Sequence, residues 1–398
     1  MDHRPPDSRR AAAEIDRINT FFPLLPSLGL RWARTRPWEG LRVAVNAHLT
    51  TLTGALMREL TLGGGEWVMC GTNEATTDPD VVALLREQGI TVHTGRGDVA
   101  NRHRATLESD PHLIADVGFG LLGALLDRSE EQAALLRGAV EITRTGINRW
   151  TERQIKQKGP LPLRLVNLND TELKSHVENR HGVGNGLWGC VTQITGLHLA
   201  GRKVVVVGYG PVGQGVAAMA RNLGASVEVV DTDDMRRLIA SYDGFPTPSL
   251  SAGLERADIA VTATGRSKAI NVDHLAELNS DLVLINAGHG HDEIDVAGLQ
   301  AEAVEGDQLN ELCLRLRLRP KGPWLTLLGG GNPLNIVMNA GSPEPVIMQF
   351  ALLGLTLEWL ATSELGLGGP PAPSVFGCSP VPREIELEIA RRALRTRR

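Results

Sequence analysis

The sequence predicts an α/β fold with two doubly wound parallel sheets in separate domains, followed by a helical C-terminal segment. Three observations lead to this class. Short apolar or β-branched runs alternate with helical stretches through residues 1–150. A second set of apolar runs starts at residue 203, and a long apolar helical stretch occupies residues 346–361. Alternating strands and helices are typical of parallel sheets that are covered by helices on both faces.

Composition excludes several classes of protein. The chain has 398 residues, enough for two or more domains, and a net charge of −5, which gives no general reason to bind nucleic acid. The basic residues 391–398 are expected to complement the dipole of a terminal helix. We expect no membrane-spanning run, and residues 1–6 have no apolar signal core, so we expect a cytoplasmic protein. The four cysteines are far apart, so no metal site or disulfide framework is predicted.

Two polar residues in the first half follow predicted strands. His48 comes after a strand at 41–45, and Asp116 lies at the end of the run 113–118. Ligand sites in doubly wound sheets form at the carboxyl ends of strands, so both positions are candidate site positions. The other elements expected in this half are a helix at 9–19, a helix ending at 62, a strand at 66–70, a helix at 78–88 and a strand at 90–93.

Two further segments carry more functional groups than a fold requires. Residues 141–146 are polar and turn-like, and residues 166–179 contain Lys174 and Glu178. On a helix, two residues four apart share one face. By this local pattern alone, a solvated ion pair is favoured over a functional site.

A strand at 203–207 leads into the most specific motif of the chain. Gly208 permits a tight turn, Gly210 lets a pyrophosphate approach the backbone, and Gly213 lets the following helix pack closely on the strand. The helix N-terminus offers free N–H groups to phosphate. Asp231 ends the next strand 18 residues after Gly213, where it can accept a hydrogen bond from a ribose hydroxyl and repel a 2′-phosphate. The unit therefore predicts an NAD site.

The remainder continues the second sheet and returns to helices. Strands are expected at 259–265 and 282–289, and the second ends at His289, which is either a site residue or a surface residue. Further expectations are a hairpin of 312–318 with 324–328, an apolar helix at 346–361 that rejoins the first domain or forms an oligomer contact, and a terminal helix after the Pro-rich residues 370–382.

Together these segments resemble the S-adenosyl-L-homocysteine hydrolase family over nearly the whole chain. The matching stretches are Asn46–Thr50, Asp116–Gly118, Glu141–Gly146, Asn169–Ser175, Glu178–Asn179, Val207–Gly210, Asn286–His289, Asp292–Asp295 and Asn335. The resemblance implies a substrate domain at 1–180, an NAD-binding Rossmann domain at 181–342, and residues 343–398 that complete the first domain. The family's C-terminal tail has no counterpart, so we expect a homo-oligomer that is a dimer rather than the family's tetramer.

The resemblance also implies chemistry without net redox change. The family uses tightly held NAD to oxidise a substrate alcohol to a ketone, which acidifies the neighbouring C–H before elimination, water addition and re-reduction. It assigns Lys174 to the alcohol step, His48 and Asp116 to acid/base work, and His289 to a place near the substrate. Glu178 stands where the family has Asp. The implied cofactor contacts are Thr143, Thr145, Asn179, Thr264 and Asn335, together with Gly208, Gly210, Gly213 and Asp231.

The implied substrate pocket departs from the family pattern. It comprises Thr50, Leu52, Ile142 and Ser342. Leu52 replaces the Glu or Gln that meets the adenine amine, Ile142 replaces a carboxylate on the ribose, and Ser342 replaces a histidine. Each lost hydrogen bond costs about 1–3 kcal/mol. The leading hypothesis is thus an adenosylhomocysteinase-like enzyme that carries out elimination and addition, or epimerisation, on a small molecule that is related to S-adenosylhomocysteine or has diverged from it. The alternatives are a true S-adenosylhomocysteine hydrolase with altered contacts and a catalytically idle NAD-binding scaffold.

Overall fold

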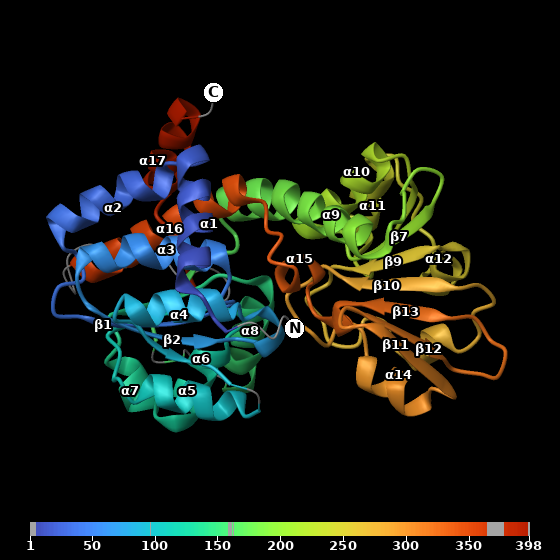
Figure 1. The fold of residues 1–398 in the computed structure, drawn as a ribbon, viewed down its shortest axis with the longest axis horizontal. Helices are drawn as coiled ribbons and strands as arrows, with labels where there is room; N and C mark the ends of the chain where they lie inside the picture. The colour runs from blue at the N-terminus through green and yellow to red at the C-terminus, as the bar shows by residue number, and fades with distance from the viewer. Residues whose placement is uncertain (1–4, 96, 158–160, 162, 364–377, 397–398) are drawn as a thin grey trace. The chain divides into compact units, whose positions relative to one another are not determined.

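Contacts divide the chain into two units, one of which is inserted in the sequence of the other. The computed structural model describes residues 5–95, 97–157, 161, 163–363 and 378–396. Residues 2–174 and 343–398 form what we call the split unit, and residues 175–342 form the inserted unit (Figure 1). Most of the expected Pro-rich segment, residues 370–377, lies outside the described residues.

The split unit is built on a seven-stranded sheet with the order β14-β6-β5-β4-β1-β2-β3. Its neighbouring strands pair in parallel. The chain order reverses between β1 and β4, which is where doubly wound sheets open a crevice for ligands. The strands are β1 (Arg42–Ala47), β2 (Glu66–Gly71), β3 (Thr91–His93), β4 (Leu113–Asp116), β5 (Gly138–Glu141), β6 (Leu165–Asn167) and β14 (Ser379–Pro380).

Helices surround this sheet, and local sequence explains where several begin. Asp78 caps the helix that starts at Pro79, and a proline at the first helical position loses no hydrogen bond. The helices are α1 (Ser8–Phe21), α2 (Leu24–Thr35), α3 (Thr51–Leu60), α4 (Pro79–Glu87), α5 (Val99–Leu107), α6 (Gly120–Arg128), α7 (Glu130–Ala134), α8 (Arg144–Gln157), α16 (Pro343–Thr362) and α17 (Arg383–Thr396), with short 3₁₀ turns η1 (Thr61–Gly63) and η2 (Glu74–Thr76).

The apolar helix α16 belongs to the split unit, which agrees with the expectation that this segment rejoins the first domain. It contacts α2, α3, α17 and the strands β4 and β5. By length and composition alone α16 could cross a membrane, which corrects the expectation that no run is long enough. However, 67% of its most apolar 18-residue window is buried, which is typical of a core helix.

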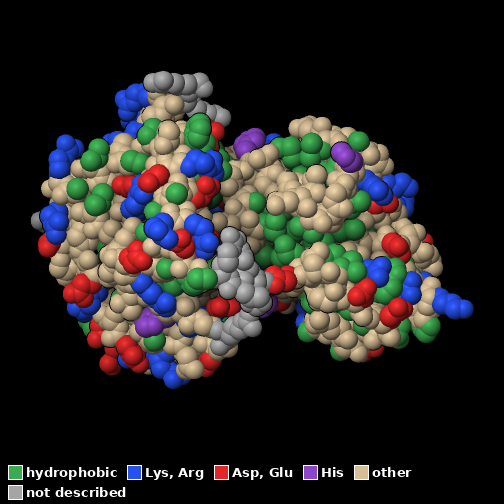
Figure 2. Space-filling view, in the orientation of Figure 1, with side chains coloured by type: hydrophobic (Ala, Val, Ile, Leu, Met, Phe, Trp, Pro, Cys, Tyr) green, Lys and Arg blue, Asp and Glu red, His purple; other side chains and the backbone are tan. Residues whose placement is uncertain are grey.

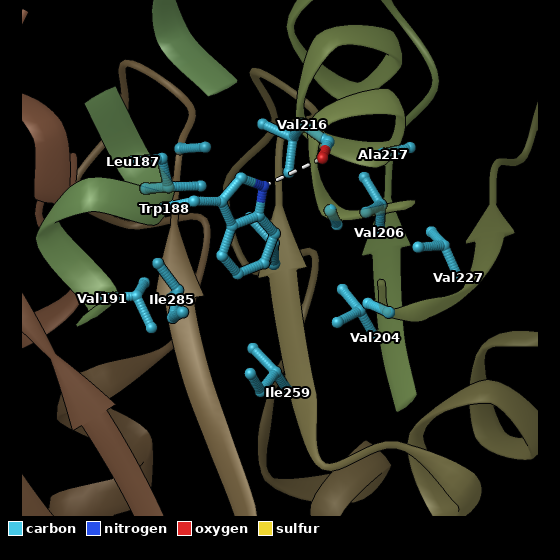
Figure 3. Packing of buried hydrophobic residues seen from close by; sticks show 14 of the residues in the cluster. Leu187, Trp188, Val191, Val204, Val206, Val216, Ala217, Val227, Ile259 and Ile285 are labelled. Carbon is cyan, nitrogen blue, oxygen red and sulfur yellow. Dashed lines mark hydrogen bonds between the residues drawn. The ribbon is translucent and has the colours of Figure 1, made fainter. Parts of the chain in front are cut away.

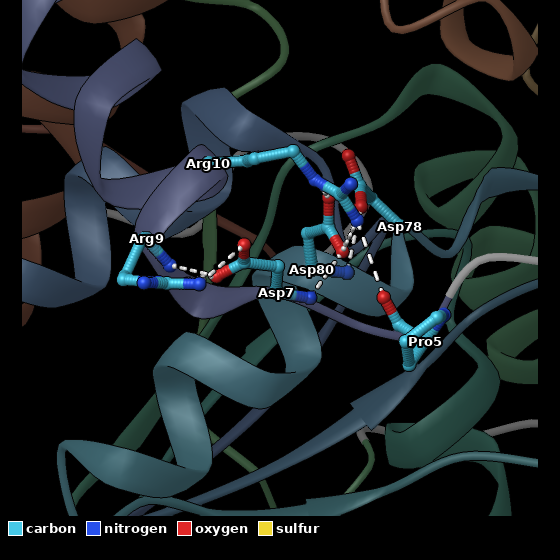
Figure 4. A network of polar contacts seen from close by, with 6 residues as sticks. All are labelled: Pro5, Asp7, Arg9, Arg10, Asp78 and Asp80. Atoms are coloured by element: carbon cyan, nitrogen blue, oxygen red, sulfur yellow. Dashed lines mark hydrogen bonds and ion pairs between the residues drawn. The ribbon is translucent and has the colours of Figure 1, made fainter.

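Polar contacts tie the N-terminal helix to α4 (Figure 4). The backbone N–H of Asp7 donates to Asp80 at 2.7 Å, and the Arg10 guanidinium donates to both oxygens of the same carboxylate at 2.8 and 3.0 Å. Asp7 also caps α1 by accepting from Arg9. Elsewhere on the visible face of the split unit, acidic and basic side chains are intermixed (Figure 2). Such intermixing is consistent with the small net charge.

The inserted unit contains a second seven-stranded sheet, with the order β11-β12-β13-β10-β9-β7-β8. The strands from β13 to β8 pair in parallel, whereas β11, β12 and β13 pair antiparallel. The predicted hairpin is present as β12 and β13, and the sheet is therefore mixed. Its strands are β7 (Lys203–Val207), β8 (Ser226–Val230), β9 (Ile259–Thr262), β10 (Leu282–Asn286), β11 (Glu305–Asn310), β12 (Cys313–Arg317) and β13 (Leu325–Leu328).

The core of the inserted unit is organised around Trp188. The indole is 1% exposed and donates to the carbonyl of Val216 at 3.0 Å (Figure 3). It packs in a cluster with Val204, Val206 and Ile285 of the sheet. The helices of this unit are α9 (Val183–Thr195), α10 (Pro211–Asn222), α11 (Asp234–Tyr242), α12 (Leu250–Arg256), α13 (Val272–Leu275), α14 (Val296–Glu302) and α15 (Leu334–Val337), with the 3₁₀ turn η4 (Gly329–Gly331).

Two local expectations need correction. Residues 141–146 are not a turn: Glu141 ends β5 and α8 begins at Arg144. The segment with Lys174 and Glu178 is helical, but it is a π-helix, η3 (Leu173–Gly182). The boundary between the split unit and the inserted unit lies at Ser175, inside this helix. π-Helical turns are rare and occur frequently at functional sites.

Candidate functional site

The polar residues of the split unit gather where β1, β4 and β5 end. Val45 pairs with Ala115, so the next residues in register are Asn46 and Asp116. Asp116 in turn lies opposite Glu141. Because β1 and β4 flank the reversal of strand order, this row occupies the position where such sheets bind ligands.

Asp116 is fully buried and held by three donors. Its Oδ1 accepts from the Asn46 amide at 2.7 Å and from its neighbour Val117 N–H at 2.8 Å. Its Oδ2 accepts from the N–H of Leu122 at 2.7 Å, in the first turn of α6. Burial raises the pKa of Asp116, and these hydrogen bonds oppose the shift. The carboxyl group is thus fixed in orientation.

Glu141 is the second fully buried carboxyl group of this row. Its Oε2 accepts from Phe119 N–H at 2.9 Å, and its Oε1 accepts from Gly118 N–H at 3.1 Å and from the Thr143 hydroxyl at 2.7 Å. Phe119 adopts a left-handed conformation (φ 61°) and provides no side-chain cap for α6. Glu141 therefore holds the strained turn after Asp116. Burial, and secondly the neighbouring Asp116, raise the pKa of Glu141 to about 8.

His48 follows β1 directly and is fixed through ring and backbone. Its Nδ1 lies 2.7 Å from the Thr76 hydroxyl and 3.1 Å from the Thr72 hydroxyl. Its carbonyl accepts from the Thr53 hydroxyl at 2.7 Å. Burial, and secondly the positive charge of Lys174, lower the pKa of His48 to about 4. The imidazole is accordingly neutral at physiological pH, and a neutral ring can accept a proton.

The predicted substrate-pocket residues lie in different surroundings. Thr50 caps α3, and its hydroxyl accepts from Thr53 N–H. Leu52 and Ile142 are buried at 6% and 7% exposure, Leu52 in the first turn of α3 and Ile142 directly after β5. Ser342 belongs to the inserted unit, where it donates to the Gly182 carbonyl and accepts from Asn185.

In the inserted unit the glycine loop has the shape of a dinucleotide cradle. Gly208 has φ +100°, and a Cβ there would lie 2.5 Å from the Ala263 carbonyl oxygen. A Cβ on Gly213 would collide with the carbonyl of Gly208, whereas one on Gly210 would meet nothing within 4 Å. Gly210 caps α10 without a side chain and so leaves its N-terminal N–H groups open to a phosphate.

Asp231 lies beside this loop at the end of β8. Its Oδ2 accepts from Tyr209 N–H at 2.7 Å, and its Oδ1 accepts from Asp233 N–H at 2.9 Å. Two backbone donors orient the carboxylate, and each of its oxygens retains further acceptor capacity for a ribose hydroxyl. The geometry fits NAD and disfavours a 2′-phosphate.

A buried network shapes the loops that follow β9 and β10. Glu293 accepts from the N–H and hydroxyl of Thr264, both at 2.8 Å, and from Gly265 N–H at 2.9 Å. Asn286 accepts from Gly288 N–H at 2.7 Å, next to the half-buried His289. Asn335 is 7% exposed, and its side-chain oxygen has no hydrogen-bond partner among the described residues. A cofactor donor would satisfy this oxygen.

The structure groups the predicted residues by unit. His48, Asp116, Thr143, Thr145 and Lys174 belong to the split unit. The inserted unit holds the other predicted catalytic and cofactor residues: Glu178, Asn179, Gly208, Gly210, Gly213, Asp231, Thr264, His289 and Asn335. Glu178 is 7% exposed on η3, and Asn179 follows it half-buried.

Several supporting residues received no role from the sequence. They are Asn46, Thr72, Thr76, Glu141, Asn286 and Glu293. The signal for Glu141 is its place at a strand end, opposite Asp116 once the strands are aligned. The same signal applies to Thr72, which follows Gly71, the β2 partner of Ala47, and so lies opposite His48. Thr76 carries no such signal, because only the folding of the η2 turn brings it to the histidine.

The fold and the site together identify the class of this protein, an NAD-dependent α/β enzyme. The NAD-binding domain model of S-adenosyl-L-homocysteine hydrolase matches residues 179–341. An adenosylhomocysteinase of Pyrobaculum aerophilum is 34% identical over 401 residues, covering 94% of this chain and 89% of the relative. An S-inosyl-L-homocysteine hydrolase of Methanopyrus kandleri is 31% identical, with coverages of 94% and 88%. An adenosylhomocysteinase of Thermococcus kodakarensis is 33% identical, with coverages of 95% and 89%.

The chain belongs to the S-adenosyl-L-homocysteine hydrolase family. This membership confirms the predicted NAD cofactor, the enzymatic nature of the protein and the α/β fold class.

Proposed function

We propose that this protein catalyses the NAD-dependent, reversible hydrolysis of an S-nucleosyl-L-homocysteine thioether to a nucleoside and homocysteine. The observation that carries the proposal is the neutral His48, held at Nδ1 by threonine hydroxyls and within electrostatic reach of Lys174. The two named activities among the relatives, on S-adenosyl- and S-inosyl-L-homocysteine, support this substrate class.

In the proposed mechanism, NAD held by the glycine loop and Asp231 would supply reversible hydride transfer at the substrate alcohol. Lys174 takes the proton of the alcohol oxygen and gives it back when the ketone is reduced. His48 takes the proton of the acidified C–H and gives it to the sulfur as the C–S bond breaks. When water adds in place of the thiol, His48 takes a proton from the water and returns one to the carbon. Because burial and the charge of Lys174 both disfavour imidazolium, His48 accepts protons only transiently.

Asp116 is assigned a different part in this proposal. Its carboxyl group is 0% exposed and bound by three donors, so it is suited to bias the electrostatics of the site and not to reach the substrate. In this proposal His48 transfers protons, whereas the Asp116 carboxyl group stays fixed and acts through its electrostatic effect.

The base of the nucleoside separates two candidate substrates. An adenine amine needs an acceptor, and Leu52, proposed here to meet the base, offers none. Hypoxanthine carries a carbonyl oxygen at the same position, and Leu52 offers it no donor either. The buried, apolar Leu52 therefore does not select adenine, and the S-inosyl-L-homocysteine hydrolase relative makes S-inosyl-L-homocysteine a second candidate substrate.

The proposal is tested by incubating NAD-loaded protein with each thioether and measuring released thiol, together with solvent deuterium incorporated next to the transient ketone. Lys174→Ala should abolish both signals, whereas Lys156→Ala, on an exposed lysine of α8, should leave them intact. Absence of thiol release and of deuterium incorporation with both substrates would reject the function. Cytoplasmic location and a homo-oligomeric, dimeric state are further parts of the proposal, tested by fractionation and by light scattering.

A further inference from the structure

We propose that Thr76 is a positioning residue that fixes the ring proton of His48 on Nδ1 and thereby leaves Nε2 as the proton-accepting atom. The inference rests on the proposed function for its catalytic meaning. The tautomer itself is a property of the folded protein and can be measured without turnover.

The environment of Thr76 leaves its hydroxyl little freedom. Thr76 ends the short turn η2 and is 3% exposed. Its hydroxyl donates to the carbonyl of Asn73 at 2.9 Å, and Asn73 itself caps the turn by accepting from Ala75 N–H. These two hydrogen bonds hold the turn in place, so the position of the Thr76 hydroxyl oxygen is fixed as well.

We assign the single hydroxyl proton of Thr76 to the Asn73 carbonyl. A threonine hydroxyl has one proton and two lone pairs, and a carbonyl oxygen can only accept. With its proton on the Asn73 carbonyl, the Thr76 oxygen presents a lone pair to His48 Nδ1 at 2.7 Å. Only an N–H at Nδ1 makes this contact favourable, because two facing lone pairs would repel each other.

Thr72 fits the same arrangement. Its hydroxyl lies 3.1 Å from Nδ1, farther than the 2.7 Å of Thr76, and can accept part of the same N–H. The backbone of His48 is independently anchored because its carbonyl accepts from Thr53 at 2.7 Å. Ring and backbone are both held, so the direction of Nε2 is set before any substrate binds.

The tautomer of His48 matters because its imidazole ring stays neutral. Burial and Lys174 keep the pKa of His48 at about 4, so nearly all molecules carry a neutral imidazole at pH 7. A neutral ring has one N–H and one acceptor nitrogen, and the wrong choice would turn the acceptor side of the ring into a donor.

Histidine-labelled protein offers a direct test by ¹H–¹⁵N correlation NMR, with the His48 signals assigned by their loss in His48→Gln. The wild type should show a protonated Nδ1 and an unprotonated Nε2. Thr76→Val should shift the population toward the Nε2–H form, and Thr76→Ser should restore it. Thr77→Val is the matched control, because the Thr77 hydroxyl donates to the same Asn73 carbonyl at 3.0 Å, whereas the hydroxyls that approach His48 Nδ1 are those of Thr76 and Thr72.

Kinetics supply a second readout once a substrate is known. Thr76→Val should lower kcat about 2- to 10-fold with KM little changed, since it removes one hydrogen bond to the His48 ring. A wild-type Nε2–H tautomer, or an unchanged tautomer in Thr76→Val, would overturn the inference. If the tautomer is as expected but no thioether is cleaved, the proposed function fails and the positioning role of Thr76 stands.

Discussion

Asp116 and Glu141 lie opposite each other at the ends of two neighbouring parallel strands, and both carboxyl groups are 0% exposed. Burial raises the pKa of each, and the Asp116 charge further raises that of Glu141 to about 8. Two such groups cannot both ionise cheaply in a low dielectric. The pair should therefore retain a proton at neutral pH.

This retention predicts how stability depends on pH. A carboxyl group whose folded pKa is raised holds its proton more tightly in the folded state, so its stabilising contribution is complete below the ordinary value of 4.5 and is lost as pH rises toward about 8. The wild-type free energy of unfolding, measured in urea, should fall over this pH window. Glu141 should account for up to ~1.4 kcal/mol per pH unit of that fall. Glu141→Gln should flatten the fall, and the exposed Glu131→Gln should not. A wild type whose stability rises over this window contradicts the prediction.

A second prediction concerns the electrostatic link between Lys174 and His48. Lys174→Met removes the positive charge and should raise the pKa of His48 above its value of about 4. The pKa should stay below the ordinary 6.5, because burial is the larger cause of the shift. Titration of the His48 ring by NMR measures this pKa and shows whether it lies between the two values. The same titration in Lys156→Met, on an exposed residue of α8, should reproduce the wild type.

The glycine loop shows how much of a site a sequence can predict. Gly208, Gly213 and Asp231 are separated by short spacings within one strand-turn-helix-strand unit, so local rules place them. The structure adds only the contacts, such as the Asp231 carboxylate on Tyr209 N–H. His48 and Asp116 are likewise predicted from local pattern alone, because each lies at the end of a strand or directly after one.

Residues whose role depends on strand order could not be found in this way. The sequence predicts a turn at Glu141, since nothing local shows that its strand lies beside the strand of Asp116. The π-helical form of the segment with Lys174 is also hidden, because sequence spacing distinguishes poorly between i→i+4 and i→i+5 pairing. Thr76 reaches His48 across 28 residues.

Trp188 should be the most sensitive position in the core of the inserted unit. Its indole is 1% exposed and its N–H donates to the Val216 carbonyl at 3.0 Å. Trp188→Ala should lower the free energy of unfolding by about 3–5 kcal/mol, because it removes packing and leaves a cavity. Trp188→Phe should cost less, since it keeps much of the packing but leaves the carbonyl without this donor. Circular dichroism in urea measures both, and Tyr242→Ala, at an 87% exposed aromatic, should be near neutral.

Cofactor choice should depend on Asp231. Asp231→Ala removes the acceptor for a ribose hydroxyl and the charge that repels a 2′-phosphate. The Kd for NAD should rise about 10- to 100-fold, as expected for loss of a hydrogen bond to a charged group, while binding of NADP should weaken less or improve. Calorimetric titration with both dinucleotides gives the ratio. Asp234→Ala is the control, because that side chain is 94% exposed at the start of α11; an unchanged NAD to NADP ratio in Asp231→Ala would count against the assignment.

The substrate base should be decided in part by Leu52. Leu52→Glu supplies an acceptor without a donor and should raise kcat/KM for S-adenosyl-L-homocysteine relative to S-inosyl-L-homocysteine about 10-fold, since satisfying a buried donor contributes about 1–3 kcal/mol. Leu52→Met keeps the volume and apolar character of this 6% exposed side chain and should leave the ratio unchanged. If Leu52→Glu lowers both values of kcat/KM equally, the residue packs α3 without meeting the base. A selectivity change confined to the glutamate variant would instead place Leu52 at the nucleoside, because a packing defect cannot distinguish an amine from a carbonyl oxygen.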